Sequence, residues 1–245
     1  MNDSIDFHLV TENIAKTLES QARFPVDVSP SWNFIVVFVS LLLLVINKHV
    51  FTQRFKIMFD ISYKKSDIDK MTREWNPIAS FTGFSVVIIY ISIVSLIIQK
   101  LVLVFSGNAI LYSGFGFYLD VVVFVSAYLI IQYLIVTLFG WLFGIEAAAS
   151  HHEVTHLSTM MSLDVILTLF SLIILFYPTR LILIVSVSII LIITGARVVK
   201  IFFELQILSK LNWLNIFLYL CTLEIIPISI AITMVCRLIL TNCVL

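Results

Sequence analysis

Charged residues are scarce in this sequence. Asp, Glu, Lys and Arg make up only 12% of its 245 residues, whereas hydrophobic residues make up 60%. A soluble domain carries roughly twice that charged fraction. The composition therefore excludes an ordinary soluble globular protein and indicates a multi-pass membrane protein. The formal net charge is zero, so no bulk affinity for nucleic acid is expected.

Cysteine is also rare, and the first residues lack the features of a leader. Cys221, Cys236 and Cys243 have no spacing typical of a metal or redox site, and three cysteines cannot all pair. Residues 1–31 are polar, without the basic start and apolar run of a signal peptide. We therefore expect a polar N-terminal tail with one short helix, followed by a membrane helix that itself directs insertion.

Long apolar runs predict a six-helix transmembrane domain in residues 32–245. A helix needs about 20 residues to cross the hydrocarbon core of a bilayer. The predicted fold class is therefore all-α, a polytopic membrane helix bundle in contact with lipid. The six spans are expected at about 32–47, 77–98, 117–141, 159–177, 181–196 and 213–235. The fifth is expected to continue as a water-exposed helix through Arg197, Lys200 and Glu204.

The connection at 48–76 is strongly basic. It holds seven of the fifteen Lys and Arg residues, and apolar side chains alternate with these charges: Phe51, Phe55, Met58, Phe59 and Ile61. This pattern is typical of a basic amphipathic helix that lies on anionic lipid. Because basic loops stay in the cytoplasm, the same segment predicts that both chain termini lie outside the cytoplasm.

The last expected span carries an acidic residue, Glu224, at its middle. A carboxyl group at this depth costs on the order of 2–3 kcal/mol, so it must face protein or a wet cavity. Pro227 follows three residues later; it lacks an N–H, and its ring collides with the carbonyl of Leu223. We interpret Glu224 and Pro227 as a kinked intramembrane polar site, which is either functional or purely structural.

Polar residues on other spans are candidate partners for Glu224. Asp164 and Thr168 are four residues apart on the fourth span, on a stripe that begins at His156. Gln132 lies near the middle of the third span. These residues predict a polar seam for a proton, an ion or a lipid headgroup. The alternative is simple hydrogen bonding between helices, which contributes about 0.6–2 kcal/mol per contact.

The segment 152–156 matches the pattern H-E-x-x-H. On a helix, His152 and His156 can reach one zinc ion, and Glu153 can act as general base on the bound water. A third protein ligand is required, and Glu146 and His151 are the nearest candidates. The alternative is the polar beginning of a membrane helix, with Glu153 stabilised in the first turn by the helix dipole.

Several stretches of the chain resemble a known family. They are Trp32 at the start of the first span, Phe-Gly-Trp-Leu-Phe at 139–143, and above all Phe-Leu-Tyr-Leu-Cys-Thr-Leu-Glu-Ile-Ile-Pro at 217–227. The chain resembles, over about 32–228, a Bacteroidota family of multi-pass inner-membrane proteins known as domain of unknown function 4271. The resemblance implies a bacterial inner-membrane protein without a known activity or established catalytic residues. His152 and His156 do not belong to the family pattern.

Three functions remain open. The favoured one is a non-enzymatic subunit or scaffold of an envelope complex, which contacts a membrane-protein partner or a second copy of itself and needs no cofactor. The second is a small proton- or ion-coupled transporter that uses Glu224. The third is a membrane zinc metallopeptidase that uses His152, Glu153 and His156, and only this one requires zinc.

Overall fold

A computed structural model of the chain describes residues 31–63, 80–106, 113–142, 144, 146–177 and 179–208, together with positions 229 and 233. These residues form six helices, which are α2 (Ser31–Val50), α3 (Thr52–Tyr63), α5 (Phe81–Ser106), α7 (Phe115–Leu142), α8 (Glu146–Phe176) and α9 (Arg180–Leu208). The expected N-terminal tail, the rest of the basic loop and the sixth span, with Glu224 and Pro227, lie outside the described residues.

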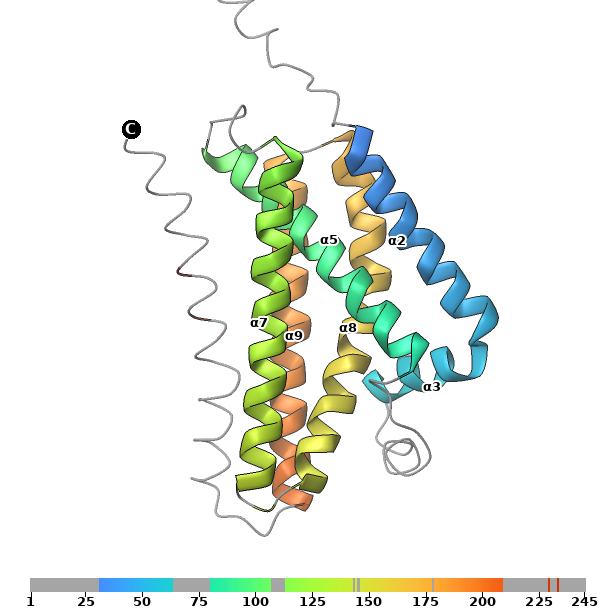
Figure 1. Cartoon of the computed structure of the whole chain (residues 1–245), viewed down its shortest axis with the longest axis vertical. Coiled ribbons are helices and arrows are strands. Elements are labelled where there is room, and N and C mark those ends of the chain that lie inside the picture. The colour runs from blue at the N-terminus through green and yellow to red at the C-terminus, as the bar shows by residue number, and fades with distance from the viewer. Residues whose placement is uncertain are drawn as a thin grey trace, which may run out of the picture.

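Five of these helices are long and apolar enough to cross a membrane. The segments are Ser31–Val50, Phe81–Phe105, Phe115–Leu142, Ala149–Phe176 and Arg180–Ile201. Successive spans run in alternating directions, and the short α3 lies at one end of the bundle (Figure 1). The chain is therefore an all-α, multi-pass membrane helix bundle, as the apolar runs predict. Which end faces the cytoplasm stays a prediction.

The fourth span, α8, is the centre of the bundle. In its most apolar stretch 61% of the residues are buried, against 17% in α9. The helix also begins at Glu146, about 13 residues earlier than the sequence predicts. The expected start of the fourth span at about 159 is therefore wrong, because Ala147, Ala148 and Ala149 favour helix and neither Gly nor Pro interrupts the segment from 146 to 176.

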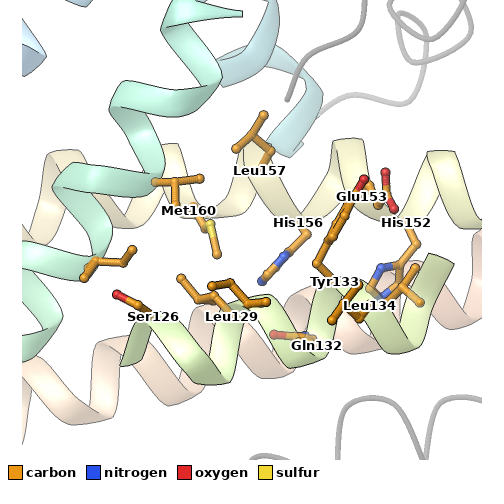
Figure 2. Close-up of a pocket in the computed structure, with 14 residues that line it drawn as sticks. Ser126, Leu129, Gln132, Tyr133, Leu134, His152, Glu153, His156, Leu157 and Met160 are labelled. Atoms are coloured by element: carbon orange, nitrogen blue, oxygen red, sulfur yellow. The ribbon is translucent and has the colours of Figure 1, made fainter. Parts of the chain in front are cut away.

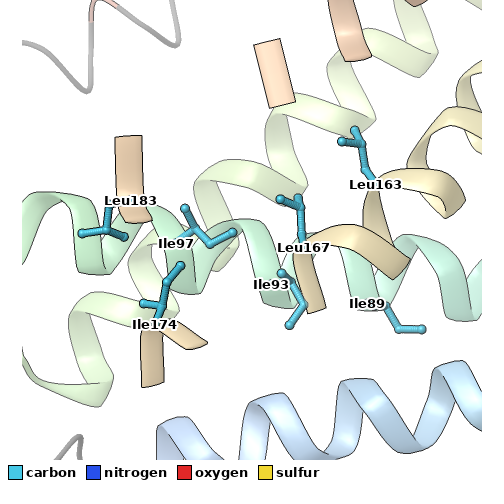
Figure 3. Close-up of a cluster of buried hydrophobic side chains, with 7 residues drawn as sticks. All are labelled: Ile89, Ile93, Ile97, Leu163, Leu167, Ile174 and Leu183. Carbon is cyan, nitrogen blue, oxygen red and sulfur yellow. The ribbon is translucent and has the colours of Figure 1, made fainter. Parts of the chain in front are cut away.

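The core of the bundle forms where α5, α8 and α9 meet. Ile89, Ile93 and Ile97 are spaced four residues apart, so they lie on one face of α5. They pack against the α8 side chains Leu163, Leu167 and Ile174 and against Leu183 of α9, all of them at most 2% exposed (Figure 3). Regular spacing on both main helices thus produces a continuous apolar seam through the bundle.

Two charged residues lie deeper than the sequence predicts. The apolar run of α5 continues past Lys100 to Phe105, so Lys100 lies inside the helix and is only 5% exposed instead of belonging to a loop. The predicted continuation of α9 past residue 196 is confirmed, but Arg197 is buried and not exposed to water. Arg197 and Ile201 are four residues apart and both lie on the inner face of α9.

The basic segment after α2 contains the predicted amphipathic helix, α3, but its apolar face contacts protein. Met58 is fully buried and packs against Val86 of α5 and Met161 of α8. The Ser158 hydroxyl also donates a hydrogen bond to the backbone carbonyl of Met58. The expectation that this face lies on lipid is therefore corrected: α3 is docked on the bundle through its apolar side.

Candidate functional site

A pocket of about 540 Å³ lies between α5, α7 and α8. Val87 and Ile91 of α5 form one wall. The other walls come from α7 (Ser126, Leu129, Ile130, Gln132, Tyr133, Leu134 and Val136) and α8 (His152, Glu153, His156, Leu157 and Met160) (Figure 2). Ser126 and Met160 are near the midpoints of α7 and α8. The pocket therefore extends from the H-E-x-x-H segment to the middle of the bundle.

The H-E-x-x-H segment lies on a helix packed against α7. The helical spacing places His152 and His156 on the same side of α8, with ring centroids 6.3 Å apart. Glu153 accepts a hydrogen bond from Thr137 Oγ1 of α7 at 3.1 Å. Glu153 is the eighth residue of α8, which places it in the third turn. The alternative of a first-turn residue stabilised by the helix dipole is therefore wrong.

A zinc site at His152 and His156 would need a third protein ligand. Among the residues that it describes, no group of three or more His, Cys, Asp or Glu side chains is arranged to hold a metal ion. His151 directly precedes His152 in the chain, but it is not among the residues that line the pocket. The backbone of Glu146 is described but its side chain is not. Zinc binding by His152 and His156 stays a prediction.

Gln132 and His156 bring unused hydrogen-bonding groups to the pocket. Gln132 is only 3% exposed, and its Nε2 atom has no hydrogen-bond partner among the described residues. The His156 ring extends from α8 toward α7, where Gln132 lies (Figure 2). Within the described part of the chain, His156 forms no hydrogen bond. A buried amide N–H without an acceptor is unfavourable, so these groups are suited to binding a ligand.

Asp164 and Thr168 lie farther along α8, beyond the pocket. Asp164 follows Met160 by one helical turn and is 2% exposed, and Thr168 is 3% exposed. Neither carboxylate oxygen of Asp164 has a hydrogen-bond partner among the described residues, and the same holds for Thr168 Oγ1. The predicted polar seam is thus buried on α8, but only His156 and Gln132 of its members line the pocket. Its relation to Glu224 and Pro227 is outside the described residues.

Apart from Gln132, sequence reasoning did not identify the α7 side of this site. Ser126 and Tyr133 line the pocket, and Thr137 binds Glu153. These three residues are separated by seven and four positions, which places them on one face of a helix. That stripe was the available signal, but polar side chains at such spacing equally fit isolated hydrogen bonds to the helix's own carbonyls.

One comparison with known proteins gives a match. The family described as Domain of unknown function (DUF4271) matches residues 33–235, which is most of the chain and includes all five described spans except the first two residues of Ser31–Val50. No curated protein and no solved structure matches the sequence.

Proposed function

The chain belongs to the DUF4271 family, and from this premise we propose that it is a membrane subunit that holds a small ligand in the pocket between α5, α7 and α8. The proposal is carried by one observation: hydrogen-bonding side chains of two helices converge on a pocket of about 540 Å³ that reaches mid-bundle. Small-molecule sites typically occupy about 300–1,000 Å³ and combine apolar walls with a few polar groups.

We also infer that this subunit belongs to an envelope complex in a bacterial inner membrane, with a membrane-protein partner or a second copy beside it. The support is on α9, where Gly195 and Ala196 are exposed. No atom lies within 4 Å of the position that a Cβ on Gly195 would take. Small residues on a membrane helix allow another helix to approach closely.

Native mass spectrometry of the full-length protein from mild detergent tests both parts of the proposal. We expect one small molecule per chain and a stoichiometric protein partner or second copy. Leu129→Trp fills the pocket and should remove the small molecule. Leu138→Trp is the matched control, because Leu138 is on the same helix, is 57% exposed and does not line the pocket.

The outcomes separate the two parts. A wild-type protein without a bound small molecule, or a Leu129→Trp variant that still carries it, contradicts the ligand-binding role. A clean monomer contradicts the complex. Gly195→Leu is expected to remove the partner and to leave the small molecule bound, since Gly195 does not line the pocket.

A proton-coupled carrier is the second candidate, favoured by Asp164. A carboxyl group at mid-span that is sealed from solvent and lacks a partner among the described residues is typical of proton relays in membrane proteins. The sequence alone suggested Glu224 for this role. Among the described residues, Asp164 is an acidic group that is almost fully buried, and it lies one helical turn beyond Met160 of the pocket lining.

Infrared difference spectroscopy at varied pH tests whether protons reach Asp164. A carrier must exchange this proton with bulk water, so we expect a carboxyl C=O band that changes with pH in the wild type and is missing in Asp164→Asn. Asp120→Asn is the control, because Asp120 is exposed on α7. A spectrum without any pH-dependent band assigned to Asp164 would exclude the carrier.

A further inference from the structure

The pocket also indicates the chemical class of its ligand, an inference that rests on the proposed ligand-binding role. Its hydrogen-bonding groups come first. The Gln132 amide offers an N–H group with no acceptor among the described residues, and its side chain is only 3% exposed. A neutral imidazole always carries one N–H donor, and His156 extends across the pocket toward α7 (Figure 2). The Gln132 amide and the His156 ring can thus each donate a hydrogen bond to an acceptor on the ligand.

The charged residues that line the pocket indicate whether the acceptor group on the ligand is anionic or neutral. Among the residues that the structure describes, Glu153 is the only acidic one that lines the pocket, and no Lys or Arg of this part of the chain lines it. One of its carboxylate oxygens is already bound to Thr137. While it is ionised, Glu153 repels a carboxylate or phosphate head on the ligand, and no Lys or Arg of the described lining offsets that repulsion. The acceptor is therefore a neutral one, and a carbonyl oxygen, which has two lone pairs, can accept from both donors.

The rest of the pocket is apolar and elongated along the helices. Beyond Gln132 and His156 its walls are Val87, Ile91, Leu129, Ile130 and Met160, and it ends near the middle of α7 and α8. Ser126 also lines this end, but its hydroxyl already donates to the carbonyl of Val122. This part offers hydrophobic contact but hardly any hydrogen-bonding groups, so an alkyl or prenyl chain fits it. The polar groups lie toward the beginning of α8 and the apolar walls toward mid-bundle, which matches the two ends of an amphiphile.

We propose that the pocket binds a neutral amphiphile, with a carbonyl-bearing head such as a quinone placed between Gln132 and His156 and an apolar tail directed toward Met160. The ligand accepts hydrogen bonds from both side chains, and its tail replaces empty space between α5 and α7. Glu153 excludes anionic amphiphiles of the same length.

Equilibrium dialysis with the full-length protein in detergent tests this class. The probe is a radiolabelled, fully substituted decylbenzoquinone, which cannot alkylate thiols. Decanoate and decyltrimethylammonium are competitors with the same tail and an anionic or cationic head. We expect saturable binding of one quinone per chain. The dissociation constant of decanoate, measured by competition, should be at least about tenfold higher than that of unlabelled quinone.

Variants assign the binding to the proposed groups. Gln132→Leu keeps the size of the side chain but removes its N–H, and the loss of one hydrogen bond should weaken quinone binding about three- to tenfold. Gln99→Leu is the matched control: Gln99 is 2% exposed on α5, and its amide donates to the Gly114 carbonyl outside the pocket. Quinone binding should be the same in Gln99→Leu as in the wild type.

Several results would overturn the inference. They are equal competition by decanoate, tighter binding of the cationic competitor, unchanged binding in Gln132→Leu, or no saturable quinone binding. If the last result occurs while native mass spectrometry still finds a small molecule that Leu129→Trp removes, the ligand-binding role stands and only the ligand class is wrong.

Discussion

Met58→Ala is expected to lower the free energy of unfolding by about 2–5 kcal/mol, the usual effect of truncating a buried large side chain to alanine. Met58 is fully buried, in contact with the cluster that contains Val86, Val154 and Met161. Its removal leaves a cavity between α3, α5 and α8. Thermal unfolding of the purified protein in detergent, followed by near-ultraviolet circular dichroism, measures the effect.

The neighbouring residue supplies the control for this prediction. Ile57 is on the same helix but is 41% exposed, so Ile57→Ala should change the free energy of unfolding by no more than about 0.5 kcal/mol. Equal effects of the two substitutions would mean that α3 does not pack on the bundle through Met58. In that case the apolar face of α3 would be free to lie on lipid, as the sequence pattern alone suggests.

Asp164→Leu is expected to raise the free energy of unfolding by about 1–3 kcal/mol, the desolvation penalty of a buried polar group without a partner. Leucine has a similar size and needs no hydrogen bond. The carboxylate of Asp164 has no partner among the described residues, so its replacement removes a penalty and breaks no contact that the structure shows. The same thermal unfolding measurement applies. A gain in stability would indicate that Asp164 is retained for function.

Asp120→Leu tests whether this gain depends on burial. Asp120 is exposed at the beginning of α7, so its replacement should leave the free energy of unfolding within about 0.5 kcal/mol of the wild type. A clear loss of stability in Asp164→Leu would contradict the prediction. It would show that Asp164 is hydrogen-bonded by a residue outside the described ranges, with Glu224 and its neighbours as the first residues to examine.

The candidate site shows where sequence reasoning succeeded and where it stopped. The stripe of His156, Asp164 and Thr168 follows from helical spacing, and the structure confirms that Asp164 and Thr168 are buried. The partnership of Glu153 with Thr137 could not be predicted in the same way. The two residues are 16 positions apart on different helices, and their meeting depends on how α7 is rotated and shifted against α8.

The α8 boundary shows a second limit. Histidines and a glutamate before residue 159 lower the local hydropathy, so the sequence predicts a loop there. The structure continues the helix through them and buries His152. Hydropathy reports the cost of exposing a residue to lipid, whereas His152, Glu153 and His156 line the pocket between the helices.

The sequence by itself determined that this is a bundle of membrane helices, that α8 carries a polar stripe, and that α3 is amphipathic. Composition and periodicity are local properties, and each is complete within one segment. Only the tertiary structure decided that α8 is the central helix, that α3 rests on protein, and that Gln132 meets His156 across a pocket. These features depend on contacts between helices far apart in the chain. The same helix faces could pair in several ways that bury similar areas, and the close packing of side chains decides which pairing forms.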